Sequence, residues 1–288
     1  MKNALLKVRE YKEIMTPTEK EIADYILDNA SLICNLTIRE FAENTYSSPS
    51  SIVRFCKKLG FEGFNDFQKS LLYDIASHNE KEENNTTLSL KANEDISSII
   101  NKVSRGNIRI IEESKKLIDE DTIVHCASLL SSARKILLFA TGSSCSAAKD
   151  FYMKLLRLDM PVIFNEDYHI QLTRAKNSTE EDLAIIFSYS GQSREIIDCM
   201  DILKKNTVTT IALTRYTPSP VSKAADYCLY VASGEPVLKK ENLASKVAIL
   251  NLVDMLYTIY IVSHYKGTFN KLLKTHLDKG DKDNYGTI

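Results

Sequence analysis

The pattern of hydrophobic and polar positions divides the chain into two parts with different periods. Up to about residue 77, apolar residues recur at helical spacing in short runs, each begun by a capping residue. From residue 135 to 231, short apolar runs alternate with amphipathic helical runs, which is typical of a doubly wound parallel sheet. The sequence therefore predicts two domains, an all-α domain followed by an α/β doubly wound parallel-sheet domain. The strands are expected at residues 135–140, 161–164, 183–187, 207–213 and 227–231.

Three helix starts are expected in the first part. Thr16-Pro17-Thr18-Glu19 is a capping box with proline at the first helical position, and Thr37 can cap a second helix. A third helix is expected to begin at Ser48, with Pro49 at its first position, and to end at a glycine. Residues 45–47 alone join the second helix to the third, and this spacing predicts a helix-turn-helix motif.

The third helix would be the recognition helix, because its outward positions carry short hydroxyls near its start and cations further along. Hydroxyls and helix N termini contact phosphates or base edges, and Arg54 can take either a guanine edge or a phosphate. Residues 48–60 hold three cations and no acid, although the first part as a whole is slightly acidic. The alternative is a small helical unit whose cations form only a solvated face. The residues expected to contact DNA are Ser48, Pro49, Ser50, Ser51, Arg54, Lys57 and Lys58.

Net charge, cysteine spacing and apolar segments limit which partners and which cellular compartment we expect for the protein. The chain of 288 residues has a net charge of −1, so any DNA contact must come from a local patch. Its six cysteines are widely spaced without a C-x-x-C pair or a histidine cluster, which favours reduced cytoplasmic thiols and predicts neither a metal nor a cofactor. No apolar signal core begins the sequence, and Asn251 and Asp254 interrupt the longest apolar run, residues 247–262. We therefore expect a buried helix there and no membrane partner.

The candidate chemistry of the second part lies in a serine-rich turn, residues 188–193, between a predicted strand and an amphipathic helix. The first turn of a helix leaves N–H groups unpaired and carries partial positive charge, and Gly191 lets the backbone approach a ligand. The hydroxyls of Ser188, Ser190 and Ser193 add donors. Because no G-x-x-x-x-G-K-[ST] sequence is present, a phosphate monoester fits better than a nucleoside triphosphate. The alternative is a turn that only caps the helix.

A second hydroxyl-rich turn, Thr141-Gly142-Ser143-Ser144, follows the first predicted strand. Ligands of doubly wound sheets bind beyond the carboxyl ends of the strands. Two such turns in one sheet are therefore a more specific signal than either turn alone.

Residues 37–64 resemble the DNA-binding domain of the RpiR family of bacterial transcriptional regulators. The resemblance centres on Ser51-Ile52-Val53-Arg54-Phe55-Cys56-Lys57-Lys58-Leu59-Gly60-Phe61 and extends back to the Thr16 capping box. The chain departs from the family in the turn, where Tyr46 stands in place of the usual glycine. A left-handed conformation there would cost a bulky residue about 1–2 kcal/mol.

The two hydroxyl-rich turns together resemble the sugar isomerase (SIS) domain, which binds phosphosugars, over about residues 135–262. The resemblance implies that the turn at residues 188–193 holds the phosphate, while Ser143 and Ser144 meet sugar hydroxyls. Glu235 aligns with an acidic residue that contacts the sugar in such domains. The implied ligand-binding residues are Ser143, Ser144, Ser188, Tyr189, Ser190, Gln192, Ser193 and Glu235.

The order of the two parts also fits RpiR regulators, which implies a cytoplasmic, DNA-binding transcriptional regulator of sugar metabolism. A phosphosugar that is bound but not transformed would control its affinity for operator DNA. A homodimer or homotetramer is expected, because a single helix-turn-helix reads only a half-site. The expected boundaries are residues 1–77 for the helix-turn-helix domain, 78–93 for a linker, 94–118 for connecting helices, 119–265 for the SIS domain and 266–288 for a C-terminal tail.

Two other interpretations stay open. In the first, the chain is a phosphosugar isomerase or lyase with a vestigial helical domain. Glu235 would then be the base and His169 or His264 the ring-opening acid, although histidines in such helical positions more often have surface or capping roles. In the second, the chain binds DNA and its SIS-like part serves only dimerisation.

Overall fold

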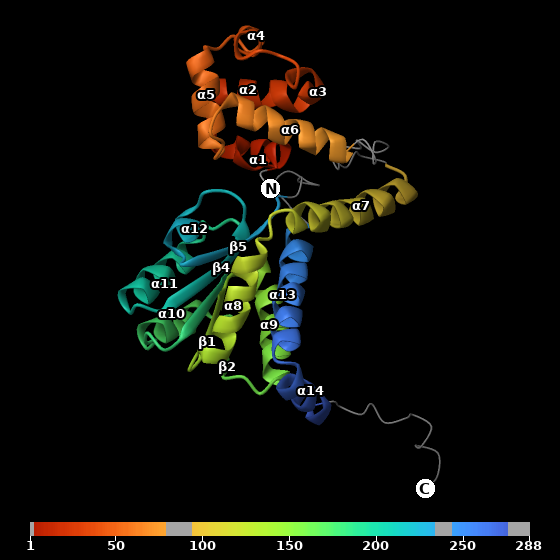
Figure 1. Ribbon diagram of the computed structural model, residues 1–288. Helices are drawn as coiled ribbons and strands as arrows, with labels where there is room; N and C mark the ends of the chain where they lie inside the picture. Colours follow the sequence, from red (N-terminus) through yellow and green to blue (C-terminus); the bar gives the residue numbers. More distant parts are fainter. Residues whose placement is uncertain (1–2, 79–93, 234–243, 276–288) are drawn as a thin grey trace. The chain divides into compact units, whose positions relative to one another are not determined.

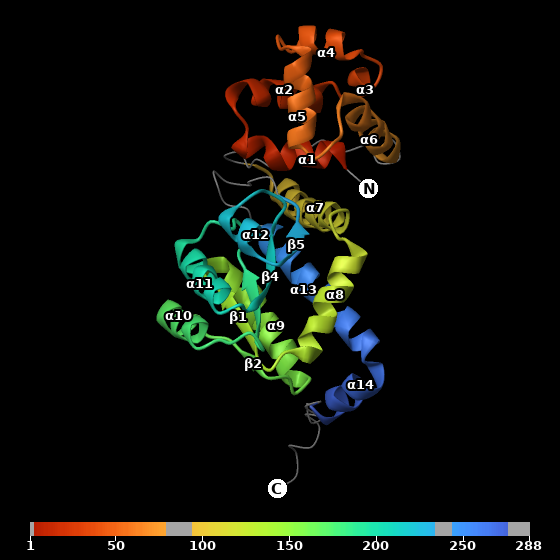
Figure 2. The ribbon, with the colours of Figure 1, turned by 60° about the vertical axis from the view of Figure 1, so that its left-hand side comes forward.

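The computed structural model describes residues 3–78, 94–233 and 244–275, which form two compact units (Figures 1 and 2). The first unit comprises the described residues within 1–118, 215–219 and 230–248, and the second comprises those within 119–214, 220–229 and 249–288. The expected linker from residue 79 onward, Glu235 and the last part of the expected tail lie outside the described residues.

The first unit is helical, and the three helix starts expected from the sequence are confirmed. Thr16 and Thr37 each form a capping box, with Glu19 and Glu40 respectively, and the Ser48 side chain accepts a hydrogen bond from the N–H of Ser51. Helices α1, α3 and α6 are additions to the predicted elements. The elements are α1 (Ala4–Tyr11), η1 (Lys12–Ile14), α2 (Pro17–Asp28), α3 (Ala30–Ile33), α4 (Ile38–Asn44), α5 (Pro49–Lys58), α6 (Phe64–His78) and α7 (Ile96–Lys115).

An aromatic and aliphatic core holds the helices around the helix-turn-helix together. The rings of Phe41 and Phe64 stack at 5.4 Å between centroids, and Phe61 meets Phe67 edge-on at 5.3 Å. Helix α5 runs across the bundle from α4 towards α1 (Figure 2) and buries one face there. The opposite face of α5 is left for solvent or a partner.

The second unit is built on a five-stranded sheet in the order β2-β1-β3-β4-β5, and the expected α/β fold is confirmed. The pairs β1–β2, β1–β3 and β3–β4 are parallel. The elements from residue 119 onward are α8 (Glu120–Ser132), β1 (Ile136–Ala140), η2 (Gly142–Ser144), α9 (Cys145–Arg157), β2 (Val162–Ile163), α10 (Tyr168–Lys176), β3 (Leu183–Phe187), α11 (Arg194–Lys205), β4 (Thr209–Arg215), α12 (Pro220–Ala224), β5 (Tyr227–Val231), α13 (Ala244–Ser263) and α14 (Tyr265–Lys274).

Helices cover both faces of this sheet, with α10, α11 and α12 on one side and α8, α9 and α13 on the other (Figure 1). On the first side, Leu137 and Ile186 pack in one cluster with Met200 of α11. On the second side, the ring of Phe187 lies 6.2 Å from that of Phe151 in α9. Because both faces are buried, the strands read as continuous apolar runs rather than alternating ones.

The longest apolar run of the sequence forms most of α13. Its segment Ser245–Ser263 is apolar and long enough to cross a membrane by length and composition alone, with mean hydropathy 1.5 and 33% of the window buried. Core helices pass the same test. Asp254 is exposed and pairs with Lys154 of α9 at 2.8 Å, while Leu252 and Leu256 are buried, so α13 buries one face and exposes the other.

The beginning of the expected C-terminal tail is helical. Residues 266–274 belong to α14, in which the rings of Tyr265 and Phe269 stack at 5.7 Å. The buried Thr268 hydroxyl donates to the carbonyl of His264 at 3.0 Å.

Candidate functional site

The two hydroxyl-rich turns lie side by side at the carboxyl edge of the sheet. Strands β1 and β3 are neighbours in a register that sets Ala140 opposite Phe187, so Thr141 and Ser188 are the first residues beyond the two strand ends. The chain leaves β1 through α9 towards β2, and it leaves β3 through α11 towards β4 on the other side. Doubly wound sheets bind their ligands where neighbouring connections diverge in this way.

Backbone hydrogen bonds fix the shape of the turn at residues 188–193. The N–H of Ser188 donates to the carbonyl of Leu213 at 3.2 Å, that of Gly191 to Ser188 at 3.1 Å, and that of Val221 to Gly191 at 3.2 Å. Gly191 has a φ of +64°, a left-handed conformation that glycine adopts without a Cβ penalty. Strand β4 and helix α12 therefore hold this turn in place.

The hydroxyl of Ser188 is a buried polar group. Ser188 is 3% exposed, and within the part of the chain that the structure describes its Oγ has no hydrogen-bond partner. A buried polar group that lacks a partner costs about 1–3 kcal/mol. Such a group in a native fold requires an explanation, and a ligand oxygen at this edge of the sheet would supply one.

The N terminus of α11 is also without a side-chain cap. Asp119 and Asp167 cap α8 and α10 of the same unit, but Ser193, the N-cap residue of α11, makes no capping hydrogen bond. Ser144, the N-cap residue of α9, makes none either. This contradicts the alternative in which the turn at residues 188–193 only caps its helix. Helix α9 continues directly from η2, whose carbonyls accept the N–H of Cys145. Of the two helices that start from the hydroxyl-rich turns, α11 is therefore the one whose N-terminal dipole end carries no cap.

The remaining residues of the 188–193 turn shape it or face outward. The carbonyl of Tyr189 accepts a hydrogen bond from the Thr214 hydroxyl at 3.3 Å. The Oγ of Ser190 accepts one from the N–H of Gln192 at 3.2 Å, and the Gln192 side chain is exposed.

The turn that follows β1 is open on its outer side. Gly142 has a φ of +57°, and no described atom lies within 4 Å of the position that a Cβ would take there. Ser143 is exposed and Ser144 half-buried, while the Ser146 hydroxyl donates to the Ser143 carbonyl at 2.7 Å. Ser143 and Ser144 thus lie in the turn that neighbours the serine-rich turn on the adjoining strand end.

In the first unit, α4, residues 45–47 and α5 form the expected helix-turn-helix. Of the residues expected to contact DNA, all are exposed except Ser51, which is half-buried. The Ser48 Oγ lies 2.8 Å from the Ser50 Oγ and 2.9 Å from the Ser51 Oγ, and Nη2 of Arg54 donates to the Ser51 Oγ at 3.4 Å. The hydroxyls at the start of α5 therefore form a connected group.

The three cations of α5 differ in their surroundings. The ammonium of Lys58 pairs with the Glu19 carboxylate at 2.6 Å, and although partial burial opposes it, this bond helps to lower the pKa of Glu19. Arg54 and Lys57 form no ion pair with the residues that the structure describes. They are the two cations of α5 whose charge is free to meet a phosphate.

Comparison with known proteins matches each half of the chain to a domain family. A model described as "Helix-turn-helix domain, rpiR family" matches residues 2–78, and one described as "SIS domain" matches residues 129–259. A relative named as an uncharacterized HTH-type transcriptional regulator, from Caldanaerobacter subterraneus subsp. tengcongensis, is 31% identical over 275 residues, which cover 96% of each chain. The chain belongs to the RpiR family. The Bacillus subtilis HTH-type regulator YbbH is 28% identical to this RpiR-family chain, over 93% of it and 94% of YbbH.

Solved structures agree with the fold of this RpiR-family chain. The Vibrio vulnificus NanR protein, in a structure complexed with ManNAc-6P, is 26% identical, with a TM-score of 0.58 over 95% of this chain and 96% of NanR. The sugar isomerase domain of an RpiR transcription factor from Sphaerobacter thermophilus is 18% identical, with a TM-score of 0.54 over 62% of this chain and 97% of that domain. At this identity the second likeness speaks for the fold alone.

The structure of this RpiR-family chain adds a residue that the sequence analysis did not predict. Gln171 of α10 is 3% exposed, its Nε2 donates to the carbonyl of Ala140 at 2.8 Å, and its Oε1 accepts from the N–H of Ala140 at 3.0 Å. Strand β2 pairs only with Ile136 and Leu137 of β1, so Gln171 makes the two bonds that a longer edge strand would make. The only sign of this role in the sequence is that Gln171 is a polar residue between two apolar ones, Ile170 and Leu172.

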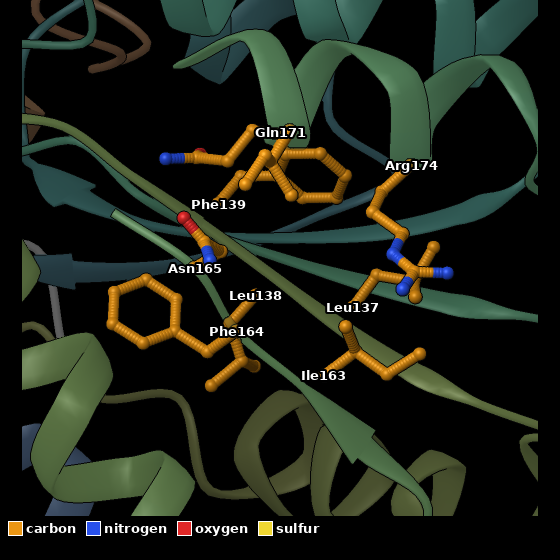
Figure 3. Close-up of a pocket in the computed structure, with 9 residues that line it drawn as sticks. Leu137, Leu138, Phe139, Ile163, Phe164, Asn165, Gln171 and Arg174 are labelled. Carbon is orange, nitrogen blue, oxygen red and sulfur yellow. The ribbon is translucent and has the colours of Figure 1, made fainter. Parts of the chain in front are cut away.

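Gln171 also borders a small pocket between α10 and the β1–β2 edge (Figure 3). None of the residues predicted to bind the ligand lines this pocket, so we do not place the phosphate there. Its lining is mainly apolar and consists of Leu137, Leu138, Phe139, Ile163, Phe164, Asn165, Ile170, Gln171 and Arg174.

The two histidines considered as acids have structural contacts. His264 stacks on Tyr260 at 4.5 Å between ring centroids, and its Nε2 lies 3.4 Å from the Ser131 Oγ. His169 lies in the first turn of α10, where its ring is 5.6 Å from that of Tyr168.

Proposed function

We propose that this transcriptional regulator binds operator DNA through α4 and α5 and that a phosphorylated sugar, held without being transformed, controls its DNA affinity. The observation that supports the ligand site best is the buried hydroxyl of Ser188 beside the uncapped N terminus of α11. Both lie at the point of the sheet where the connections diverge. We place the protein in the cytoplasm, as a dimer or tetramer.

The phosphate is assigned to the turn at residues 188–193 for electrostatic reasons. A helix N terminus carries about half a positive charge, and backbone N–H groups there point at an anion. The hydroxyls of Ser188 and Ser193 add two donors that no capping bond uses. A neutral sugar without phosphate would leave this positive end unmatched.

The sugar is assigned to the neighbouring turn, through Ser143, Ser144 and, by the resemblance, Glu235. NanR matches 95% of this chain and has a structure complexed with ManNAc-6P, which suggests where to begin the search. We therefore place N-acetylamino-sugar phosphates first among the candidate effectors, followed by other hexose phosphates and pentose phosphates.

The link between ligand and DNA is proposed as a change in the geometry of paired recognition helices. Allosteric coupling of about 1–3 kcal/mol is typical and would change DNA affinity roughly 5- to 150-fold. A dimer would read an inverted repeat whose half-site centres lie one helical turn or a multiple apart.

The proposal is tested by the thermal shift of the full-length protein with a panel of sugar phosphates, each beside its unphosphorylated sugar. A ligand at 100 times its dissociation constant stabilises the domain that binds it by about 2.7 kcal/mol. We expect one phosphosugar to raise Tm and its dephosphorylated form to leave it unchanged. A raised Tm with both forms would argue against a phosphate site at residues 188–193.

The stabilising compound is then used to separate the alternatives. The regulator predicts altered DNA affinity and no chemical change in the compound, followed by NMR of the sugar over hours. Turnover that disappears in Glu235→Gln would instead identify an isomerase or lyase. If the compound changes DNA affinity by the same factor in wild type and in the double variant Ser188→Ala/Ser193→Ala, the two hydroxyls do not hold the compound.

A further inference from the structure

The turn of the helix-turn-helix contains a strained tyrosine. Tyr46 has a φ of +48°, in the left-handed region that side chains other than glycine rarely adopt. The N–H of Ser47 donates to the carbonyl of Ala42 at 2.8 Å and that of Tyr46 to Glu43 at 3.1 Å. These two bonds define a Schellman motif that ends α4, and Tyr46 occupies the position where glycine is favoured.

Comparison with the other left-handed helix ends shows that the strain at Tyr46 lacks the usual compensation. The same pair of hydrogen bonds ends α5, α9 and α11, where Gly60, Asp159 and Thr207 have φ values of +82°, +53° and +55°. In each of those three, the next residue is a buried apolar one that packs on the helix. These residues are Phe61 at 3% exposure, Met160 at 8% and Val208 at 1%.

The end of α4 has no such apolar residue. The corresponding position is Ser47, whose hydroxyl pairs with that of Thr45 at 2.9 Å. Tyr46 itself is 98% exposed, so its ring gains no burial within the domain. A bulky residue kept in a strained conformation without packing is a mark of a functional position.

The place of Tyr46 in the fold indicates its partner. Tyr46 comes two residues before Ser48, the N-cap of α5, whose first turn presents the exposed Pro49 and Ser50. In this motif the N-terminal residues of the second helix meet base edges in the major groove, so the residue just before it lies near the phosphate backbone at the groove edge. A phenol hydroxyl donates to phosphate oxygens without carrying charge, and its ring packs on the sugar.

We propose that Tyr46 is a DNA-backbone contact, with its ring against a deoxyribose and its hydroxyl donating to a phosphate oxygen beside the groove that receives α5. The inference rests on the proposed function, since it requires that α4 and α5 bind DNA. It adds a contact that needs no charge to a domain with two free cations, Arg54 and Lys57, on its recognition helix. The strain at residue 46 is the cost of placing an aromatic donor where glycine would be more stable.

The test uses the full-length protein and a mixed-sequence DNA duplex of about 30 base pairs, because backbone contacts are independent of sequence. Affinity is measured by fluorescence anisotropy at several salt concentrations. Tyr46→Phe should weaken binding about 3- to 10-fold, the net effect of one hydrogen bond, with an unchanged salt slope. Lys57→Ala should instead reduce the salt slope by about 1.

Tyr46→Gly gives the sharper result, because stability and binding should move in opposite directions. Relief of the left-handed strain should raise Tm by about 1–4 °C, while loss of the ring and hydroxyl should weaken DNA binding about 10-fold or more. Thr207→Gly is the matched control, since it relieves the same strain at the end of α11 and should leave DNA binding unchanged. Tyr73→Phe, at a tyrosine of α6 that is 55% exposed, should also leave it unchanged.

Three contrary outcomes of the experiment have different meanings. If wild type does not bind the duplex at any salt concentration, the proposed DNA-binding function fails. If wild type binds and both Tyr46 variants bind equally well, Tyr46 is not a DNA contact and this inference is overturned. If Tyr46→Gly weakens binding while Tyr46→Phe does not, the ring but not the hydroxyl contacts the backbone, and the hydrogen bond to phosphate is overturned.

Discussion

Two helices of this protein, α5 and α11, begin in serine-rich turns, and the serine hydroxyls of the two turns differ in their hydrogen bonds. At the start of α5, the Ser48 Oγ accepts from the N–H of Ser51 at 3.2 Å and contacts two further serine hydroxyls. At the start of α11, Ser193 makes no capping bond, and the Ser188 Oγ has no partner among the residues that the structure describes. The first turn is satisfied internally, whereas the second leaves a buried hydroxyl and a helix N terminus unsatisfied, which is where we propose that the ligand binds.

The difference follows from what surrounds each turn. The start of α5 is exposed, so its serines bond one another and the helix N terminus while solvent reaches them. Backbone hydrogen bonds to β4 and α12 fix the turn at residues 188–193, and its Ser188 is buried with a hydroxyl that meets no partner among the described residues. Composition alone therefore does not separate a helix cap from an anion site. The tertiary hydrogen bonds of each turn show which hydroxyls the fold itself satisfies.

The largest effect is expected at Gln171, whose buried side chain satisfies two backbone groups of Ala140, directly before the turn at the proposed ligand site. Gln171→Met would remove both hydrogen bonds to the backbone of Ala140, which is fully buried. The N–H and the carbonyl of Ala140 would then lack partners, and each such group costs about 1–3 kcal/mol. We expect the free energy of unfolding of the second unit to fall by about 2–4 kcal/mol in urea. Phosphosugar affinity should also fall, because Ala140 precedes the turn at residues 141–144.

Arg174→Met is the control for Gln171, since Arg174 lies on the same helix and borders the same pocket but is exposed. Its effect should stay within about 0.5 kcal/mol. Equal destabilisation by the two variants would contradict a specific role of the Gln171 amide.

A second buried side chain, the carboxylate of Glu10 in α1, is expected to make the free energy of unfolding depend on pH, even though it is hydrogen-bonded. Within the first unit, the N–H and hydroxyl of Ser233 both donate to its carboxylate. Burial nevertheless raises the pKa of Glu10 to about 7, and the nearby Glu113 adds to the rise while Arg215 opposes it. Burial outweighs the bonds from Ser233, which lower the pKa.

The folded chain therefore holds the Glu10 proton more tightly than the unfolded chain, in which the pKa is near 4.5. This contribution is fully present below pH 4.5 and is lost as the pH rises to about 7, by up to about 3 kcal/mol. Glu10→Gln should remove that slope and raise stability above pH 7. The urea midpoints of wild type and Glu10→Gln are measured at each pH from 4.5 to 8. A difference between the two midpoints that does not change with pH would contradict this role of Glu10.

The sequence predicts most of the fold because its signals are local. The capping boxes at Thr16 and Thr37, the start of α5 at Ser48 and the five strands are each set by a few adjacent residues. The two serine-rich turns are also visible, and strand alternation indicates that they meet at one edge. The pairing of β1 with β3, which brings them side by side, is a long-range property that only the sheet order reveals.

The parts that escape sequence analysis depend on contacts between distant residues. Gln171 meets Ala140 across 31 positions, and the Lys58–Glu19 pair spans 39 positions. That pair removes one of the cations expected to contact DNA from the free charge of α5. Tyr46 is an intermediate case. The sequence shows a tyrosine where such turns usually have glycine, but the exposure of the Tyr46 side chain is known only from the structure.

Substitution of the unpartnered hydroxyl should separate ligand binding from stability. Ser188→Ala removes a buried donor that has no described partner, so the unliganded protein should be as stable as wild type or slightly more stable. Its affinity for the phosphosugar should fall about 10- to 100-fold, the loss of one charge-assisted hydrogen bond. Isothermal calorimetry and urea unfolding measure the two effects on the same sample.

Ser178→Ala is the matched change at a buried serine with a partner, because the Ser178 hydroxyl donates to the carbonyl of Ala175 at 2.6 Å. It should destabilise the second unit by about 1 kcal/mol and leave ligand affinity unchanged. The opposite pattern, with Ser188→Ala destabilised and binding normally, would mean that Ser188 is a structural residue.

The smallest effect compares the two N-cap serines directly. Ser48→Ala should destabilise the first unit by about 1 kcal/mol, whereas Ser48→Gly should cost only a few tenths, because glycine is tolerated at an N-cap. Ser193→Ala should cost nothing in the unliganded protein, since its side chain caps no N–H. With the phosphosugar bound, Ser193→Ala should lose part of the ligand-induced rise in Tm, and Ser48→Ala should keep it whole. Equal losses of unliganded stability in the two alanine variants would erase the distinction between a satisfied cap and an open anion site.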